Sequence, residues 1–246
     1  MLQRHWKVIG VLLSIFVIWK VFLASPRIKT KLPYQLIYKE TIYGGKAYGP
    51  IPMLIMLHGS GGDETNWIKY FSIARSPIRV ISFRGPISSG LRGYDWSGPT
   101  RGDTQEKANQ LFYSMLKDSA KSVAMAIPEL ARKYPTKGKP FLTGFSAGGE
   151  IAYTIAANYP DVFDTIFPLS GRLNAAVIPL EKIAGEPMTT VIAYHAPNDE
   201  VISFGTGVAA VKALSDLGIK ATLVEHNAGH MIPANVFSEI AAKILE

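Results

Sequence analysis

The sequence predicts an α/β fold in which helices flank a mainly parallel central sheet. The first observation is that short apolar, β-prone runs alternate along the chain with longer runs of helical periodicity. The second is size and composition: 246 residues, 48% of them hydrophobic, are enough to bury one large core. Because no internal repeat or low-complexity tract interrupts this pattern, we expect one globular domain.

The expected elements follow a basic, proline-containing linker at residues 25–33. Strands are expected at residues 34–42, 51–57, 79–83, 140–143, 161–169, 189–195 and 221–225, the first of them as an antiparallel edge. Helices are expected at residues 63–73, 104–134, 147–158, 208–217 and 233–245. Within the longest helix we expect Pro128 to kink or break the chain, because proline lacks the N–H that an internal helical position donates.

The most informative motif is Gly144–Gly148, with the sequence Gly-Phe-Ser-Ala-Gly between an expected strand and an expected helix. A Gly-x-Ser-x-Gly turn in this position is the arrangement of a nucleophile elbow. The turn is so tight that Ser146 takes a strained backbone, and the glycines avoid clashes that a Cβ would create. The Ser146 hydroxyl would then lie beside a helix N-terminus, which stabilises negative charge. Because the motif is short, a plain strand-to-helix turn capped by Ser146 is the alternative.

Two further side chains complete a candidate catalytic constellation. His230 lies on a loop after the last expected strand, and we expect it to act toward Ser146 as general base and then as general acid. Asp199 follows the strand expected at 189–195, at the end where catalytic groups gather in open α/β sheets. It would orient His230 and stabilise the imidazolium. The chain order Ser146, Asp199, His230 is more specific than any one of these motifs.

Each of these two assignments has an alternative. His226 is the competing base, although it lies at the strand end, where its ring is expected to face the sheet surface. Asp199 could instead close a turn after Pro197, and the adjacent Glu200 is a second acidic candidate.

A glycine-rich loop, His58–Gly62, follows the apolar strand expected at 51–57. Glycines allow backbone N–H groups to turn toward a developing oxyanion. We expect the N–H groups of Ser60 and Ala147 to form an oxyanion hole, each contributing roughly 3–4 kcal/mol of transition-state stabilisation. His58 is expected to brace the loop. A phosphate-binding loop is disfavoured, because the lysine and the spacing of that motif are missing.

These motifs resemble those of the carboxylesterase/phospholipase group of α/β-hydrolases, which includes the acyl-protein thioesterases. The matching pieces lie between residues 51 and 233: Leu57–Gly62 with Trp67 shortly after it, Gly144–Gly149, the Asp199 turn with Val201, and Gly229-His230. The resemblance implies the α/β-hydrolase fold, a Ser-His-Asp triad, ester or thioester substrates, and neither a metal nor a cofactor.

The long stretch at residues 85–99, rich in glycine, serine and proline, is the expected lining of the substrate site. The segment at residues 84–96 resembles the loop that lines the substrate cleft in members of the group. Tyr94 and Trp96, together with Trp67, are expected to form an apolar wall for a small-molecule or lipid-like ester. The alternative is that Tyr94 and Trp96 pack as a small satellite cluster. The acyl chain length and the identity of the substrate stay open.

Composition excludes several other classes of site and partner. The chain has no cysteine, which excludes disulfides, thiolate metal sites and a cysteine nucleophile. The formal net charge is +7, but the basic residues are scattered and form no stripe, so a nucleic acid is not expected as a partner. The sequence leaves the oligomeric state open.

The segment at residues 8–24 is almost entirely apolar. We expect a membrane anchor rather than a cleaved signal peptide, because Leu23–Pro26 is a poor cleavage site. The predicted organisation is an anchor or signal segment with its linker at residues 1–33, followed by a hydrolase domain at residues 34–246. The catalytic domain would then lie outside the cytoplasm, and cleavage would make the protein secreted or periplasmic.

The sequence therefore predicts a serine hydrolase that cleaves carboxylic esters through an acyl-enzyme intermediate. Acyl transfer to an alcohol, or peptide cleavage, would use the same triad and is the alternative. A non-catalytic, membrane-tethered binding module is a remote alternative, because neither the triad nor its glycines are missing.

Overall fold

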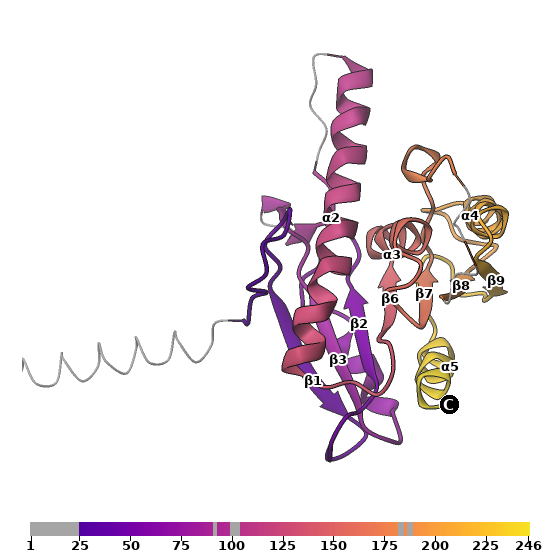
Figure 1. Ribbon diagram of the computed structural model, residues 1–246. Helices are drawn as coiled ribbons and strands as arrows, with labels where there is room; N and C mark the ends of the chain where they lie inside the picture. The colour runs from indigo at the N-terminus through magenta and orange to yellow at the C-terminus, as the bar shows by residue number, and fades with distance from the viewer. Residues whose placement is uncertain (1–24, 91–92, 99–103, 182–184, 186–188) are drawn as a thin grey trace, which may run out of the picture.

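The computed structural model describes residues 25–90, 93–98, 104–181, 185 and 189–246. Its centre is a seven-stranded sheet with the strand order β1-β3-β2-β6-β7-β8-β9 (Figure 1). The strands are β1 (Tyr38–Tyr43), β2 (Met53–Leu57), β3 (Ile78–Phe83), β6 (Phe141–Phe145), β7 (Thr165–Leu169), β8 (Thr190–His195) and β9 (Lys220–Glu225). Only β1 pairs antiparallel in this sheet, at its edge against β3, so the predicted α/β architecture with an antiparallel edge is confirmed.

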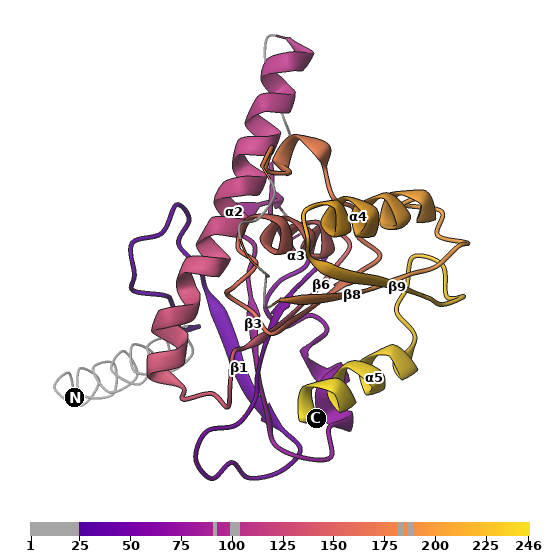
Figure 2. The same ribbon diagram turned by 45° about the vertical axis from the view of Figure 1, so that its right-hand side comes forward.

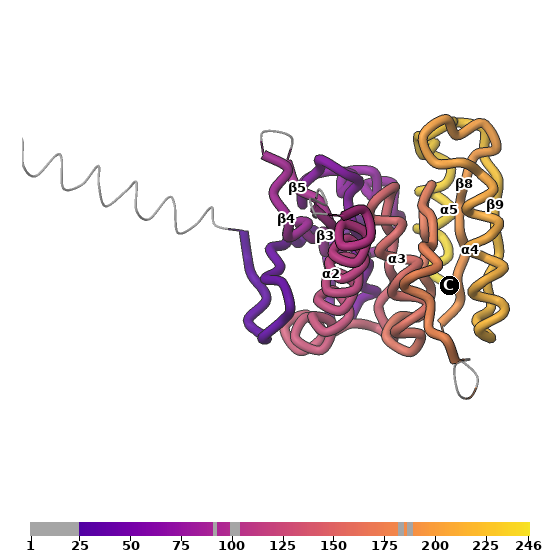
Figure 3. The backbone as a smooth tube through the Cα atoms, turned by 90° about the horizontal axis from the view of Figure 1, so that it is seen from above, coloured from indigo at the N-terminus to yellow at the C-terminus, as the bar shows by residue number. Residues whose placement is uncertain are grey.

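Helices cover both faces of the sheet, as Figures 1 and 2 show. One face carries α2 (Gln105–Lys133), α3 (Ala147–Asn158) and α4 (Phe204–Asp216), and Figure 3 shows α2 and α3 side by side. The opposite face carries α5 (Ala234–Leu245) and the short 3-10 helix η1 (Ile68–Ile73). Smaller elements are the ribbon of β4 (Ile87–Ser88) with β5 (Tyr94–Asp95) and the 3-10 helix η3 (Ala175–Val177).

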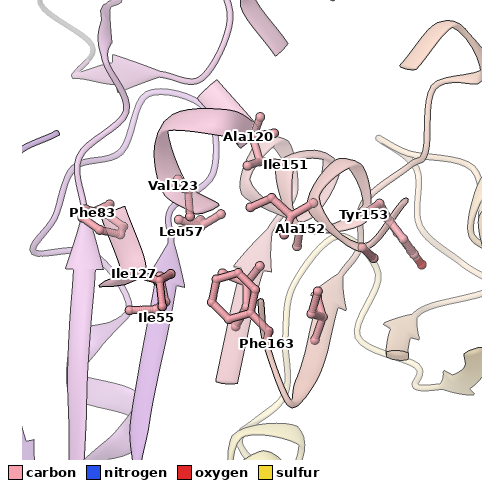
Figure 4. Close-up of a cluster of buried hydrophobic side chains, with 14 of the residues drawn as sticks. Ile55, Leu57, Phe83, Ala120, Val123, Ile127, Ile151, Ala152, Tyr153 and Phe163 are labelled. Atoms are coloured by element: carbon pink, nitrogen blue, oxygen red, sulfur yellow. The ribbon is translucent and has the colours of Figure 1, made fainter. Parts of the chain in front are cut away.

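Strand β2 shows why the sheet is buried on both faces. All of its residues are buried, and alternate side chains of a strand point to opposite faces. Ile55 and Leu57 belong to the core under α2 and α3, where Figure 4 shows them near Val123 and Ile127. The neighbouring side chain of Met56 instead belongs to the second core, under η1 and α5.

Helix α2 differs from the prediction at Pro128. Its N-terminus is capped as expected, because the Thr104 hydroxyl accepts a hydrogen bond from the Lys107 N–H at 3.3 Å. Pro128 was expected to kink or break the helix; the helix continues through Pro128 to Lys133, so it is not broken there. Proline removes one hydrogen bond of the helix, but the buried side chains of Ile127 and Leu130 anchor the segment in the core.

The helix predicted at residues 63–73 is also shorter than expected. The Asp63 carboxylate accepts the Thr65 N–H at 2.7 Å, while the Asp63 N–H donates to the side chain of Asn66 at 2.7 Å. These bonds close a turn instead of starting a helix. Trp67 then takes a left-handed backbone (φ 66°), and helical structure begins only at Ile68.

Residues 25–33, predicted as a linker, pack against the domain. Ile28 is buried, and its N–H donates to the Leu36 carbonyl at 3.1 Å. The N–H groups of Lys29 and Thr30 donate to the Glu129 carboxylate of α2. The predicted anchor at residues 8–24 lies outside the described residues. Within the described part of the chain, none of the helices combines the length and apolar character needed to cross a membrane.

Candidate active site

The three residues of the predicted triad meet at the carboxyl edge of the sheet. Ser146 follows β6, Asp199 lies on the loop after β8, and His230 lies on the loop after β9. Because these strands are parallel, their carboxyl ends lie at one edge and bring together side chains far apart in the sequence.

The elbow has the strained geometry that the sequence predicts. Ser146 adopts φ 53° and ψ −115°, a conformation that non-glycine residues rarely take. Its N–H donates to the Leu169 carbonyl at 2.9 Å, which ties the elbow to the next strand. A Cβ on Gly144 would lie 2.2 Å from the Gly148 carbonyl oxygen, and a Cβ on Gly148 would lie 2.5 Å from the Leu57 carbonyl oxygen. The turn therefore requires glycine at both positions.

A continuous hydrogen-bonded path joins the three side chains. The Ser146 Oγ lies 3.0 Å from the His230 Nε2, and the His230 Nδ1 lies 2.8 Å from the Asp199 Oδ2. With Nδ1–H donating to the carboxylate, Nε2 is left to accept the proton of the Ser146 hydroxyl. The competing base, His226, has no such contact with Ser146, and the alternative acid Glu200 is exposed.

Asp199 is held as an anion. Its side chain is fully buried, and its Oδ1 accepts the N–H groups of Val201 and Ile202 at 2.9 and 2.8 Å. Burial by itself raises the pKa of Asp199, but the hydrogen bonds from His230 and from these two N–H groups outweigh it. The pKa of Asp199 therefore lies below its usual range.

The sequence did not point to a second imidazole on the same carboxylate. The Nε2 of His195, the last residue of β8, lies 2.8 Å from the Ile202 carbonyl oxygen and 3.3 Å from the Asp199 Oδ2. Both neighbours are acceptors, so this nitrogen carries the hydrogen. His195 lies four residues before Asp199 in the sequence. This spacing indicates a contact between the two side chains only when the conformation of the intervening turn is known.

The two N–H groups predicted to form the oxyanion hole belong to two segments, Ser60 to the loop after β2 and Ala147 to the start of α3. In the His58–Gly62 loop, the Gly61 N–H donates to the Tyr94 carbonyl and the Gly62 N–H to the Gly59 carbonyl. The Ser60 N–H has no such partner among the described residues. The Ala147 N–H lies in the first turn of α3, where N–H groups lack a partner within the helix. Neither N–H group therefore has a backbone partner among the described residues, and their role in binding an oxyanion stays a prediction.

The loop is braced from a distant part of the chain. The His58 Nε2 accepts the Gly85 N–H at 2.8 Å, and its Nδ1–H donates to the Gly59 carbonyl at 2.7 Å, so His58 has the bracing contacts predicted for it. Burial lowers the pKa of His58, which favours this neutral form. The Ser60 hydroxyl also donates to the Asp95 carboxylate, a partner that the sequence pattern did not reveal.

The three aromatic residues predicted to bind substrate have different surroundings. The Trp67 ring packs 4.6 Å from the Phe145 ring, which in turn lies 5.0 Å from the His230 imidazole. The Tyr94 ring is covered by the Arg84 guanidinium at 4.5 Å.

Trp96 has no exposed surface, and its Nε1–H donates to the His58 carbonyl at 2.8 Å. The prediction that Trp96 lines the substrate site is therefore wrong, because its ring is committed to supporting the loop.

The fold and the sequence place this protein among the α/β-hydrolases, and within them among the serine hydrolases. A family model described as phospholipase/carboxylesterase matches residues 46–245. The chain therefore belongs to the phospholipase/carboxylesterase family of α/β-hydrolases.

One known protein is similar to about half of this chain. Pyrrolizixenacetamide deacetylase of Xenorhabdus hominickii is 32% identical over 128 residues, which are 52% of this chain and 40% of that protein. The matched region thus spans less than half the length of that relative.

Solved structures with the same fold include two that are each 20% identical to this chain. The carboxylesterase of Bacillus cereus aligns with 84% of this chain and 93% of its own, with a TM-score of 0.66. Acyl-protein thioesterase 2 of Zea mays aligns with 84% of this chain and 97% of its own, with a TM-score of 0.63. At this identity the likeness shows the fold alone.

Proposed function

We propose that this protein is a serine hydrolase that cleaves carboxylic esters through an acyl-enzyme intermediate. The observation that carries the proposal is the continuous path from Ser146 through His230 to Asp199, with contacts of 3.0 and 2.8 Å. Distances of this size permit proton transfer between nucleophile and base. Membership of the phospholipase/carboxylesterase family supports the same reaction class.

In the proposed reaction, Ser146 Oγ attacks the ester carbonyl carbon while His230 takes its proton. The negative charge on the carbonyl oxygen is stabilised by the N–H groups of Ser60 and Ala147, each worth about 3–4 kcal/mol. The intermediate collapses as His230 protonates the departing alcohol. Water, deprotonated by His230, then attacks the acyl-enzyme and releases the acid. Asp199 stays ionised throughout, as its lowered pKa requires.

The test is hydrolysis of p-nitrophenyl esters, from acetyl to dodecanoyl, by the full-length protein and by Ser146→Ala. We expect turnover to fall by at least about 10⁴-fold in the variant, because the attacking oxygen is gone. The chain-length optimum would separate small from lipid-like acyl groups. The same melting temperature in both proteins would show that the fold is intact.

Labelling with a serine-reactive fluorophosphonate supplies the control, since intact mass should increase in the wild-type protein and stay unchanged in Ser146→Ala. Wild-type turnover in Ser146→Ala would contradict the proposal. A folded wild-type protein that neither hydrolyses an ester nor takes the label would instead revive the non-catalytic binding module, which the comparisons do not support.

Amide deacetylation is a second candidate, favoured by the similarity to a protein named as a deacetylase. It would use the same acyl-enzyme, with an amine in place of the alcohol as leaving group. Parallel assays with p-nitroacetanilide and p-nitrophenyl acetate compare the two leaving groups on one acetyl group. Competing alcohol acceptors in the same assays would reveal acyl transfer as an ester product.

A further inference from the structure

We propose that the substrate of this site carries a carboxylate, which Arg172 binds in a cavity beside the elbow. This inference rests on the proposed ester hydrolysis and adds a substrate class to it. It begins from a cavity of about 520 Å³ bounded by three elements of the chain. Its lining includes Asn109, Phe112, Tyr113, Arg172, Leu173 and Thr206.

The cavity lies on the catalytic side of the sheet. Figures 1 and 2 show the first half of α2 rising beyond the carboxyl ends of the strands, beside the segment that contains η3. Arg172 lies three residues after Leu169, whose carbonyl accepts the Ser146 N–H at 2.9 Å. The cavity therefore begins within one loop of the nucleophile, and its volume is in the usual range for small-molecule sites.

A buried carboxylate fixes the position of Arg172. Glu150 lies in the first turn of α3, and the Glu150 N–H donates to the Ser146 carbonyl at 3.0 Å. Its side chain is only 8% exposed, and its Oε1 accepts the Arg172 Nε–H at 3.2 Å. Burial raises the pKa of Glu150 against the opposing effect of Arg172. A carboxylate buried beside the elbow is costly unless it is paired, so Arg172 is held in place by the residue that it neutralises.

The outer end of the guanidinium is left for a ligand. The Arg172 side chain is 48% exposed, and among the described residues only its Nε–H has a partner. A guanidinium carries four further N–H groups on its two terminal nitrogens, in a plane that matches the two oxygens of a carboxylate. Among the described residues that line the cavity, Arg172 is the only cation, so its terminal N–H groups are where a carboxylate would bind.

The other residues that line the cavity indicate which chemical group of the substrate would accompany its carboxylate. Phe112 and Tyr113 meet edge to face, with ring centroids 5.7 Å apart, and present aromatic surface. The Thr206 hydroxyl donates to the Ser203 carbonyl, and the Asn174 carboxamide caps η3, so both are engaged in local turns. The cavity therefore suits an apolar or aromatic group that ends in a carboxylate.

The experiment compares esters that differ only in charge, using the full-length protein. On the alcohol side, p-acetoxybenzoate is compared with the neutral p-acetoxybenzamide. On the acyl side, the p-nitrophenyl monoester of adipic acid is compared with the p-nitrophenyl ester of adipic acid monoamide. The readout is the ratio of kcat/KM for the charged over the neutral member, which cancels effects common to both.

We expect a ratio well above one in at least one pair, and a fall of about 10- to 100-fold in Arg172→Gln, the size expected for hydrogen bonds to a charged group. Any effect of the unpaired Glu150 carboxylate on the elbow acts on both members of a pair and cancels in the ratio. Glu150→Gln removes the negative charge of the ion pair but keeps an oxygen that can accept the Arg172 Nε–H, so Arg172 should stay in place and the ratio within about threefold of wild type.

Two further controls separate a direct contact of the substrate with Arg172 from a general effect of the protein's positive charge. Lys212→Gln removes an exposed cation from α4, outside the cavity lining, and Arg79→Gln breaks an ion pair with Glu40 on β1. Both should leave the ratio unchanged. A wild-type ratio of one or below in both pairs, or an unchanged ratio in Arg172→Gln, would overturn the proposal. Equal losses of the ratio in Arg172→Gln and Glu150→Gln would also overturn the proposal, because the ion pair would then act only by maintaining the shape of the site.

A binding measurement keeps this result separate from the proposed function. Calorimetric titration with p-hydroxybenzoate against p-hydroxybenzamide, and with adipamic acid against adipamide, requires no turnover. If the neutral esters are cleaved but charge has no effect, the ester hydrolase stands and the Arg172 site falls. If no ester is cleaved, a preference of the wild-type protein for a carboxylate that Arg172→Gln lacks still supports the site, and equal binding overturns it.

Discussion

The elbow at Gly144–Gly149 and the loop at His58–Gly62 face each other across the candidate active site, but they are held in different ways. A Cβ built on Gly59 would lie only 3.4 Å from the Ser146 Cβ, so the two segments are neighbours. The elbow is fixed by close backbone contacts between its own strand, its own helix and the adjacent strands. The loop is fixed mainly by residues of the distant segment at 85–96. Adding a side chain at an elbow glycine should therefore destabilise the fold, whereas disturbing the contacts that support the loop should mainly misplace its N–H donors.

The largest effect should come from Gly148→Ala. The added Cβ would lie 2.5 and 2.6 Å from the carbonyl oxygens of Leu57 and His58, which belong to backbone in the middle of the sheet. Because this backbone cannot move without disturbing β2, we expect a loss of about 3 kcal/mol or more in the free energy of unfolding, measured by urea denaturation.

Gly205→Ala is the matched control for that variant. It lies in the first turn of α4, and its Cβ would meet only the Ser203 Oγ at 3.7 Å. Alanine there should keep or slightly raise stability, since it favours a helix. Equal losses in both variants would show that close packing does not set the tolerance of the elbow.

Gly93→Ala should instead reduce activity more than stability. Gly93 has φ +98°, and its Cβ would lie 2.3 Å from the Gly61 carbonyl oxygen, within the His58–Gly62 loop. The loop must move to avoid the collision, so we expect kcat to fall by about 10²- to 10³-fold, as when one oxyanion donor is lost. The measurement is ester turnover per fluorophosphonate-reactive site, together with the melting temperature.

Gly90→Ala supplies the control here, because Gly90 also has a positive φ (+68°) but nothing lies within 4 Å of its Cβ. It carries the backbone strain without the collision. Near-wild-type turnover in Gly90→Ala is expected, and a comparable fall in kcat would assign the effect to strain in the segment rather than to the loop.

Trp96→Phe tests whether this ring supports the loop or contacts substrate. The change removes the Nε1–H bond to the His58 carbonyl and leaves a small void in a fully buried position. We expect a loss of about 1–3 kcal/mol in unfolding free energy with KM unchanged across the ester series. A KM that rises selectively for one acyl length would show instead that the residue shapes the substrate site.

The smallest effect concerns pH and His58. Burial lowers the pKa of His58 from its ordinary value of 6.5, so the unfolded chain binds this proton more readily than the folded protein does. The contribution of His58 to stability is therefore present above pH 6.5 and is lost as pH falls through and below that value.

His58→Gln should flatten the pH dependence of unfolding free energy below neutrality by up to about 1.4 kcal/mol per pH unit. His226 shares the direction of shift, since burial also lowers its pKa, so some slope should persist in the variant. Parallel pH profiles for wild type and variant would contradict the assignment of a depressed pKa to His58.

Most of the strands and helices could be predicted from the sequence, because their apolar patterns and end signals are local. The helix expected at 147–158 has those bounds in the structure, and the edge strand is antiparallel as expected. The prediction failed where local signals compete. Asp63 closes a turn where a helix was expected to begin, and packing carries α2 through Pro128.

The residues of the candidate site also divide into those that could be predicted from the sequence and those that could not. The identities and order of Ser146, Asp199 and His230 could be predicted, because each follows a recognisable strand. Trp96 was misjudged, because aromatic residues serve equally well in a core and in a binding wall, and only burial separates the two.

The sequence by itself determined the α/β class, the elbow and the candidate triad, since apolar periodicity and glycine placement encode them over a few residues. The tertiary structure alone decided which groups support them. His195 shares the Asp199 carboxylate, Asp95 holds Ser60, and Glu150 directs Arg172 toward a cavity. The physical reason is that such contacts depend on where parallel strands end relative to one another, and no local pattern records that distance.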